Sequence, residues 1–443
     1  MKLIAGLVLW CCLVGQAVAL NNELASHPSP YLALHGDDPV AWQEWGPEAF
    51  AAAQRENKLV YVSVGYFSCH WCHVMQDESY KHPDIAKILN RHFIPVKVDR
   101  ELQPALDEAL MAFVQSTQGR GGWPLNVFLT PEGYPLYAVL YVPPESFAEV
   151  IGKIHALWRE DPQRIAAVAR QHGPNGFADR SADLDAAAVL ALGNIFEEMT
   201  LGVADTFEGG FGNQSRFPHV PQLDYLLHRY GHTPNAQIRE VLETTLDAMA
   251  QRGLHDHVGS GFFRYTVDPG WSVPHFEKML YDNAQLAKLY LNAGRVLGRA
   301  DYSAVGFAAL DFMLTAMQGN NGTMIASLSA IDKLGREGAY YLFDDDALAQ
   351  ALTPDEERVL RAVWSLPDAA AFDYGHLLVN QAPPELAAMQ LGWAPDEIER
   401  TLASAMGKLR GLRSDRSLPV DDKVLAGWNA LAMEAFIAGA RQS

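Results

Sequence analysis

Residues 59–75, LVYVSVGYFSCHWCHVM, decide the fold of the N-terminal part of this chain. The first seven, 59–65, are mostly β-branched or aromatic, which is typical of a strand. Cys69 and Cys72 follow, three residues apart, where a segment with helical spacing begins. The free N–H groups of a first helical turn and the helix dipole favour a thiolate at Cys69, and Cys72 lies one turn on, close enough to form a disulfide. The arrangement is typical of a dithiol redox centre.

The same letters fit two other kinds of site. Residues 69–73 spell C-x-x-C-H, the pattern of c-type haem attachment, and contain two cysteines and two histidines that could bind zinc. Haem would need a second axial ligand and a helical domain around it, whereas this motif follows a strand. A structural zinc site needs four ligands, and the sequence has no second C-x-x-C. The context favours the dithiol, with no metal and no cofactor expected.

In a dithiol mechanism Cys69 is expected to be the attacking thiol, exposed at the start of the helix, and Cys72 the buried resolving thiol. His70 lies between them, where a polar residue tunes the pKa of the first thiol. His73 lies four residues after Cys69, on the same helical face, so it either assists the thiols or merely packs. The catalytic candidates are therefore Cys69, Cys72, His70 and His73. The substrate-binding candidates of this region are Trp71, Trp123 and Pro124.

Length and charge limit the possible classes of protein. With 443 residues the chain is too long for one ordinary core, so two domains are expected. A net charge of −19, spread along the chain, argues against nucleic acid or an anionic membrane as partner.

The N-terminus predicts export. Residues 1–19 combine Lys2, an apolar run and Ala17-Val18-Ala19, which is typical of a cleaved signal peptide and leaves no membrane anchor. We expect a secreted or periplasmic protein, in which Cys69 and Cys72 are the only cysteines left after cleavage.

Residues 20–172 predict a thioredoxin-like α/β domain, because strand-like and helix-like segments alternate in a suitable order. Trp123 would precede a cis-proline that faces the cysteines. The expected strands are 59–65, 94–99, 125–129 and 136–141. The expected helices, besides the one that carries the cysteines, are 47–57, 106–118 and 146–171.

The pattern changes after a linker at 173–182. Residues 183–443 are mostly helical in periodicity, and paired helices with long loops suggest an (α/α) toroid. The expected helices are 184–201, 222–230, 238–252, 277–297, 302–318, 398–412 and 423–440.

Longer motifs run through both domains. They are DPVAW (38–42), CHWCHVM (69–75), VKVDRE (96–101), GGWPL (121–125), GGFG (209–212), GFFRY (261–265), PHFEKMLYDNA (274–284) and DDKVLAGWN (421–429). Together they resemble the spermatogenesis-associated protein 20-like thioredoxin-domain family. The resemblance implies a thioredoxin-like domain joined to a helical domain of the six-hairpin glycosidase and sugar 2-epimerase architecture.

Three departures accompany this resemblance. Ser63 stands six residues before Cys69, where thioredoxins usually have a buried acid. Residues 329–333, SAIDK, replace an acidic run of the family, and the expected helices are fewer than twelve. We therefore expect an incomplete or shortened toroid.

The helical domain has its own candidate site, a loop-rich window with the residue types that sugar-active enzymes use. Its substrate-binding candidates are Arg264, His275, Glu277 and Asp282. The alternative is that these charges pair at the start of a helix and the aromatic residues form core.

Three hypotheses follow. The first is an exported thiol–disulfide oxidoreductase that acts on protein thiols or disulfides, with a helical domain that recognises the partner or a glycan. The second is a carbohydrate-active protein of the epimerase or glycosidase type, and the third is an interaction scaffold without catalysis.

Overall fold

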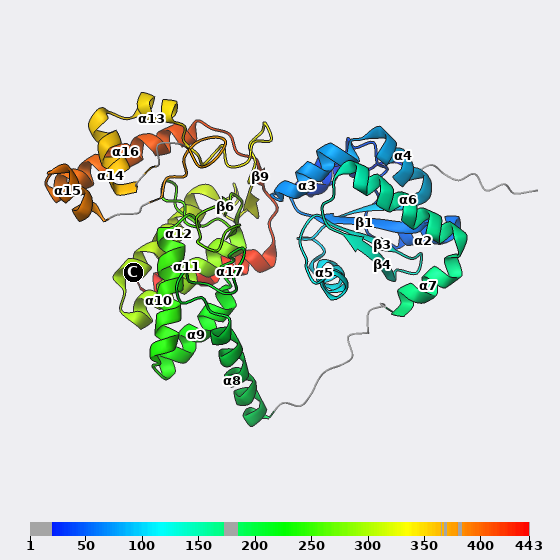
Figure 1. Cartoon of the computed structure of the whole chain (residues 1–443), viewed down its shortest axis with the longest axis horizontal. Helices are drawn as coiled ribbons and strands as arrows, with labels where there is room; N and C mark the ends of the chain where they lie inside the picture. Colours follow the sequence, from blue (N-terminus) through cyan, green and yellow to red (C-terminus); the bar gives the residue numbers. More distant parts are fainter. Residues whose placement is uncertain (1–19, 172–184, 365, 367–369, 380–382, 443) are drawn as a thin grey trace, which may run out of the picture.

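The computed structural model describes residues 20–171, 185–364, 366, 370–379 and 383–442. The signal peptide expected at 1–19 lies outside these residues, and so does the linker expected at 173–182. A thioredoxin-like domain and a helical domain lie side by side (Figure 1). Among the described helices none is both long and apolar enough to cross a membrane.

A four-stranded sheet in the order β2-β1-β3-β4 forms the centre of the first domain. β1 (Leu59–Gly65) pairs in parallel with β2 (Phe93–Asp99) and antiparallel with β3 (Leu125–Leu129). β4 (Pro135–Val139) pairs antiparallel with β3. Every residue of β1, β2 and β3 is buried, because helices cover both faces of the sheet. The four predicted strands are confirmed.

Helices cover the two faces with separate cores. One face packs Val62 and Val96 against α2 (Pro47–Glu56) and α5 (Pro104–Gln118). The opposite face packs Tyr61 against a second set of helices. These are α3 (His70–Met75), α4 (Pro83–His92) and α6 (Pro144–Glu160). Smaller elements are η1 (Leu24–Ser26), α1 (Pro30–Leu34) and η2 (Gln76–Tyr80), which continues α3.

The single helix predicted over 146–171 is wrong. The chain forms α6, ending at Glu160, and then α7 (Pro162–Gln171). Pro162 has no N–H to donate and disfavours helical geometry at Asp161, so one helix ends and another begins there.

The described part of the second domain contains ten helices. They are α8 (Ala186–Gly202), α9 (Val220–His232), α10 (Ala236–Gln251), α11 (Leu280–Leu297), α12 (Ala300–Ala316), α13 (Asp345–Ala351), α14 (Pro354–Trp364), α15 (Pro384–Leu391), α16 (Pro395–Ser414) and α17 (Ala426–Ala440). The arrangement is toroid-like, as predicted. The expected helices omitted α13 and α15, which are short, and α14, although Pro354 and an acidic first turn mark its start.

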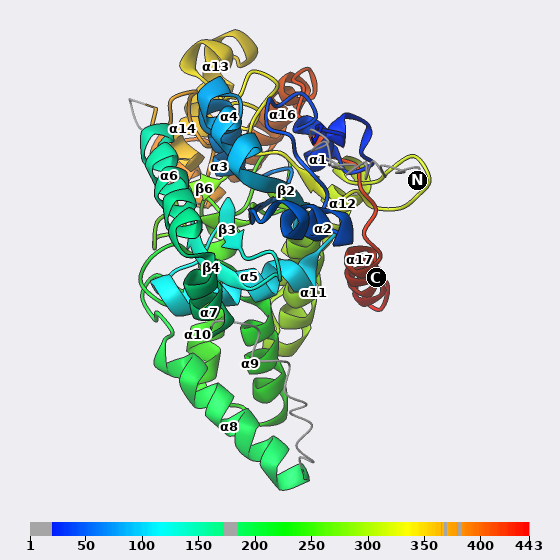
Figure 2. The ribbon, with the colours of Figure 1, turned by 90° about the vertical axis from the view of Figure 1, so that its right-hand side faces the viewer.

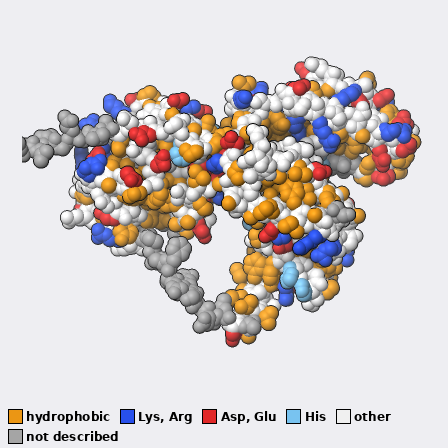
Figure 3. All heavy atoms as spheres, turned by 180° about the vertical axis from the view of Figure 1, so that it is seen from behind, with side chains coloured by type: hydrophobic (Ala, Val, Ile, Leu, Met, Phe, Trp, Pro, Cys, Tyr) orange, Lys and Arg blue, Asp and Glu red, His pale blue; other side chains and the backbone are white. Residues whose placement is uncertain are grey.

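α11 lies in the middle of this domain, with α12 and α17 packed beside it. α8 extends away from the other helices (Figure 2). It exposes apolar side chains such as Leu190 and Met199, and hydrophobic atoms gather over it in Figure 3.

Short strands occupy the side of the helical domain that faces the first domain. β5 (Tyr265–Thr266) pairs with β6 (Pro274–His275). β7 (Lys278–Met279), β8 (Ser327–Leu328) and β9 (Val420–Asp421) form a three-stranded sheet. The helix predicted from residue 277 therefore begins only at Leu280, because the residues before it pair as strands.

Candidate active site

The two cysteines lie at the start of α3, shortly after the end of β1. Cys69 is the N-cap of α3, and it forms a disulfide with Cys72. The backbone N–H of Cys72 donates to Cys69 Sγ at 3.2 Å. The peptide bond between Trp123 and Pro124 is cis, as predicted, and Trp123 lines the same cavity as Cys69. The sequence therefore placed the cysteines and the cis-proline correctly relative to the fold.

The predicted exposure of Cys69 is wrong. Cys69 is 3% exposed and Cys72 is 1% exposed, because the helical domain lies against the start of α3. Cys69 instead borders a cavity of about 340 Å³ between the two domains, here called the interdomain cleft. Its walls include Cys69, Trp71 and Trp123 from the first domain and Phe217, Arg264, Tyr265 and His275 from the second.

Glu277 joins the helical domain to the residues just before Cys69. Ser68 Oγ donates to Glu277 Oε2 at 3.1 Å, and Tyr66 Oη donates to Oε1 at 3.2 Å. Arg264 Nη1 donates to the same Oε1 at 3.1 Å and also contacts Tyr66 Oη. Glu277 is fully buried, so the cation and two hydroxyls replace the water that its carboxylate loses.

His70 faces a carboxylate of the other domain. Its Nε2 lies 3.6 Å from Glu337 Oε2, and His275 Nδ1 lies 2.6 Å from Glu337 Oε1. Burial lowers the pKa of His70. Burial also acts to lower the pKa of His275, but the hydrogen bond to Glu337 and the nearby charge of Glu277 outweigh it and raise that pKa overall. His70, which lies between the cysteines, is thus close to Glu337, a residue that the sequence did not single out.

His73 makes a local contact. Its Nε2 lies 2.7 Å from the carbonyl oxygen of Phe67, and burial lowers the pKa of its ring. This hydrogen bond holds the turn that leads into α3. A role for His73 in the thiol chemistry stays a prediction.

A buried lysine contacts Ser63, the position where thioredoxins usually have an acid. Lys97 Nζ donates to Ser63 Oγ at 3.0 Å, and burial lowers the pKa of Lys97 to about 7. Tyr31 Oη has no hydrogen-bond partner among the described residues. A Cβ added to Gly65 would lie 2.2 Å from Tyr31 Oη and 2.8 Å from Cys72 Sγ. The Tyr31 hydroxyl and the Cys72 sulfur are therefore both packed against Gly65.

Lys423 makes a second buried contact between the domains. Its Nζ lies 2.6 Å from Asp99 Oδ2, 3.0 Å from Glu101 Oε2 and 2.7 Å from Asp421 Oδ2. Asp99 ends β2 and Glu101 follows it, whereas Lys423 precedes α17. Three carboxylates share one cation, and burial raises the pKa of Glu101 to about 8 although Lys423 opposes the shift. The motifs at 96–101 and 421–429 contained these residues, but nothing in the sequence paired them.

The sugar-binding candidates lie at this interface. Arg264 and His275 line the interdomain cleft, and Glu277 is buried behind it. Asp282 lies in the first turn of α11, where burial raises its pKa to about 8, with Arg264 opposing the shift. The structure brings Arg264, His275 and Glu277 together, but around the cysteines. Sugar binding stays a prediction.

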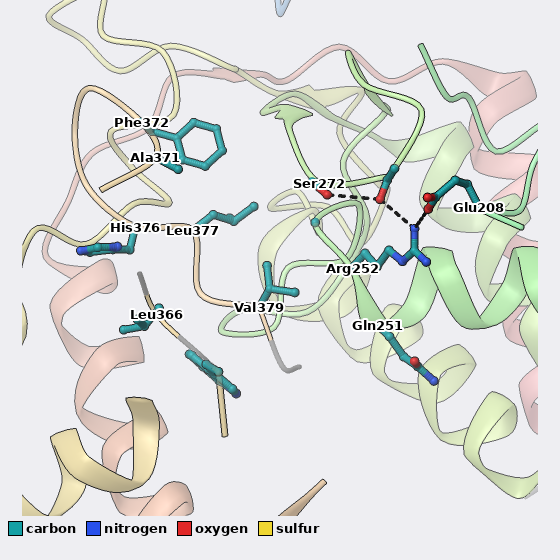
Figure 4. A pocket seen from close by; sticks show the side chains of 13 residues that line it. Glu208, Gln251, Arg252, Ser272, Leu366, Ala371, Phe372, His376, Leu377 and Val379 are labelled. Carbon is teal, nitrogen blue, oxygen red and sulfur yellow. Dashed lines mark hydrogen bonds and ion pairs between the residues drawn. The ribbon is translucent and has the colours of Figure 1, made fainter. Parts of the chain in front are cut away.

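A larger cavity of about 570 Å³ lies within the helical domain (Figure 4). Arg252 Nη1 pairs there with Glu208 and donates to the carbonyl oxygen of Gly270 at 3.0 Å. Among the described residues that line it, Glu208 is the single carboxylate, whereas glycosidases commonly use two. In the described part of the chain no group of His, Cys, Asp and Glu is placed to hold a metal ion.

The sheet order, the cysteine pair after β1 and the opposing cis-proline define a thioredoxin-like domain, joined here to a toroid-like helical domain. Residues 21–173 match the family model Thioredox_DsbH, described as a protein of unknown function, DUF255. Over 461 aligned residues the chain is 34% identical to spermatogenesis-associated protein 20 of Homo sapiens, covering 94% of this chain and 58% of that protein. The chain is thus homologous to spermatogenesis-associated protein 20 over nearly its whole length, and its first domain matches the DUF255 model. It spans less than two thirds of the length of the curated relatives it matches.

Two solved structures are each similar to part of the chain. One is DsbH oxidoreductase, with 19% identity, a TM-score of 0.23, and coverage of 27% of this chain and 85% of that one. The other is cellobiose 2-epimerase from Spirochaeta thermophila DSM 6192, with 13% identity, a TM-score of 0.29, and coverage of 58% and 71%.

Proposed function

We propose that this protein is a thiol–disulfide oxidoreductase in which Cys69 and Cys72 exchange two electrons with a thiol or disulfide substrate. The observation that carries the proposal is the Cys69–Cys72 disulfide at the start of α3, beside a cavity that Trp123 of the cis-proline loop also lines. The free N–H groups and dipole of α3 favour a thiolate at its N-cap, so Cys69 is the nucleophile.

The chemistry balances in two exchanges. The Cys69 thiolate attacks one sulfur of a disulfide, so that a mixed disulfide forms and one thiolate leaves. The Cys72 thiolate then attacks Cys69 Sγ, which releases the second thiolate and forms the Cys69–Cys72 disulfide. Two electrons pass from the cysteine pair to the substrate, and the reverse sequence oxidises two thiols.

The helical domain contributes the outer wall of this site. Arg264, Tyr265 and His275 enclose the space in front of Cys69, and Glu277 fixes that wall to Ser68. His70 has a partly buried ring beside Glu337 and is proposed to tune the Cys69 thiolate.

A redox titration of the purified protein tests this function. Free thiols are alkylated in glutathione and dithiothreitol buffers of graded ratio, and intact mass counts the thiols that react. We expect one reversible two-electron transition, with a potential between roughly −120 and −270 mV, as in dithiol oxidoreductases. Thiols that stay reduced in every buffer would contradict the proposal.

Two single variants separate the roles of the cysteines. Cys72→Ser should trap a mixed disulfide at Cys69, whereas Cys69→Ser should form none with the same substrate. Equal trapping by both variants would contradict the assigned order of attack.

We also propose that the protein is exported. Residues 1–19 support this proposal by their sequence alone. N-terminal sequencing of the protein from fractionated cells would find the mature chain beginning after Ala19, outside the cytoplasm; an intact N-terminus in the cytoplasm would contradict export.

A further inference from the structure

The shape and charge of the interdomain cleft restrict what can reach Cys69. A folded protein partner typically buries about 800 Å² on each side of an interface. The 340 Å³ of the cleft is near the lower limit for small-molecule sites. Cys69 borders the cleft and is only 3% exposed. A disulfide held within the surface of a folded protein therefore cannot approach the Cys69 sulfur in this arrangement of the domains.

Two groups in the wall have hydrogen-bonding capacity left over. The side-chain hydrogen bonds of Arg264 all use Nη1, so Nε and Nη2 have no partner among the described residues. His275 uses Nδ1 for Glu337, and its Nε2 likewise has no partner within the described ranges. The Glu337 carboxylate only accepts when ionised, so Nδ1 carries a proton in this hydrogen bond.

The surface of the cleft presents cationic side chains and no anionic one among the described lining residues. The described residues that line it include Arg264 and His275 and no carboxylate. Glu277 and Glu337 pair with these two side chains from behind the wall, so the positive groups face the cleft while their counter-charges lie outside its lining. A guanidinium with free N–H groups is well suited to a carboxylate, which it can bind through two parallel hydrogen bonds.

We infer that the cleft binds a low-molecular-weight thiol or disulfide that carries a carboxylate, with its sulfur at Cys69 and its carboxylate at Arg264. This inference rests on the proposed function and narrows the expected protein substrate to a small molecule. Trp71 and Phe217 line the outer part of the cleft, and both are partly exposed. The exchange itself is the two-step reaction given above, with the small disulfide as oxidant or the small thiol as reductant.

Two small disulfides of opposite charge test the inference. The reduced protein is mixed with dithiodiglycolate, which carries two carboxylates, or with cystamine, which carries two ammonium groups. Each rate is divided by the rate of free dithiothreitol with the same disulfide, which removes intrinsic reactivity. We expect this normalised rate to be at least tenfold higher for dithiodiglycolate than for cystamine. The net charge of −19 would by itself favour cystamine, so this preference would come from the cleft.

The same comparison of rates is made with the variant Arg264→Gln. Measured as the ratio of the two disulfides within this variant, which cancels any general change in access to Cys69, the preference for dithiodiglycolate should fall to about threefold or less. If this variant does not fold, the ratio in the unaltered protein still decides. A ratio of one or less, a preference that persists in Arg264→Gln, or faster reduction of insulin than of dithiodiglycolate would overturn the inference. If dithiothreitol still titrates the cysteine pair, only the inference fails; if it does not, the proposed function fails as well.

Discussion

Glu277 of the helical domain accepts a hydrogen bond from Ser68, the residue directly before Cys69. The contact joins residues 209 positions apart and is fully buried. It means that the surroundings of the cysteine pair belong to both domains. The helical domain is therefore part of the proposed redox site, to which it contributes a wall and charged groups.

Removing the Glu277 carboxylate should destabilise the protein strongly. Glu277→Ala leaves Arg264 buried without its counter-charge, at a cost of roughly 3–5 kcal/mol. Urea unfolding measures the loss, and alkylation of Cys69 in the reduced, folded variant should become faster as the wall loosens. Glu434→Gln is the control, because Glu434 pairs with Lys288 at the surface, and it should change little. Equal effects of the two variants would contradict a structural role for Glu277.

The Glu337–His275 pair should make stability depend on pH. The raised pKa of His275 adds stability that is fully present below about pH 6.5, its ordinary value, and is lost as pH rises through the folded value. Glu337→Gln should therefore lower the free energy of unfolding by roughly 1 kcal/mol near pH 6, since Glu337 is partly exposed, and by less near pH 9. Denaturant titrations at both pH values check this, with Glu132→Gln at the surface as control. A loss that is the same at both would count against the pair.

Glu101 should oppose folding at high pH. Burial raises its pKa to about 8, so the folded protein keeps a proton that the unfolded chain releases above about pH 4.3. Stability should therefore fall between about pH 5 and 8, by at most roughly 1.4 kcal/mol per pH unit. Glu101→Gln, which has no proton to lose, should flatten this fall. Parallel pH profiles for the two proteins would show that Glu101 is ionised in the fold.

Gly65 should tolerate no side chain. A Cβ there would lie 2.2 Å from Tyr31 Oη and 2.8 Å from Cys72 Sγ, so Gly65→Ala should cost roughly 1–3 kcal/mol as both groups move. Gly152→Ala in α6 is the matched control, because its Cβ would meet nothing within 4 Å. It should stabilise the protein by roughly 0.5–1 kcal/mol. Thermal unfolding of both variants decides, and a stable Gly65→Ala protein would refute the close packing around Cys72.

The cysteine pair and its place in the fold could be predicted from sequence because their signals are local. The strand 59–65, the cysteine spacing and the cis-proline at Pro124 depend on neighbouring residues, and each is confirmed. The break at Pro162 was equally local, although the expected helix ran across it. The order of strands and helices was enough to predict the fold class.

Burial and pairing across the chain were decided only by the tertiary structure. Lys423 meets Asp99 across 324 residues, and Arg264 and Glu277 lie close to the cysteine pair although their types fitted a sugar site equally well. The sequence determined which groups can carry charge or exchange electrons. Which of them lose water, and next to which partner, depends on how two separately packed domains meet, and no local pattern encodes that contact.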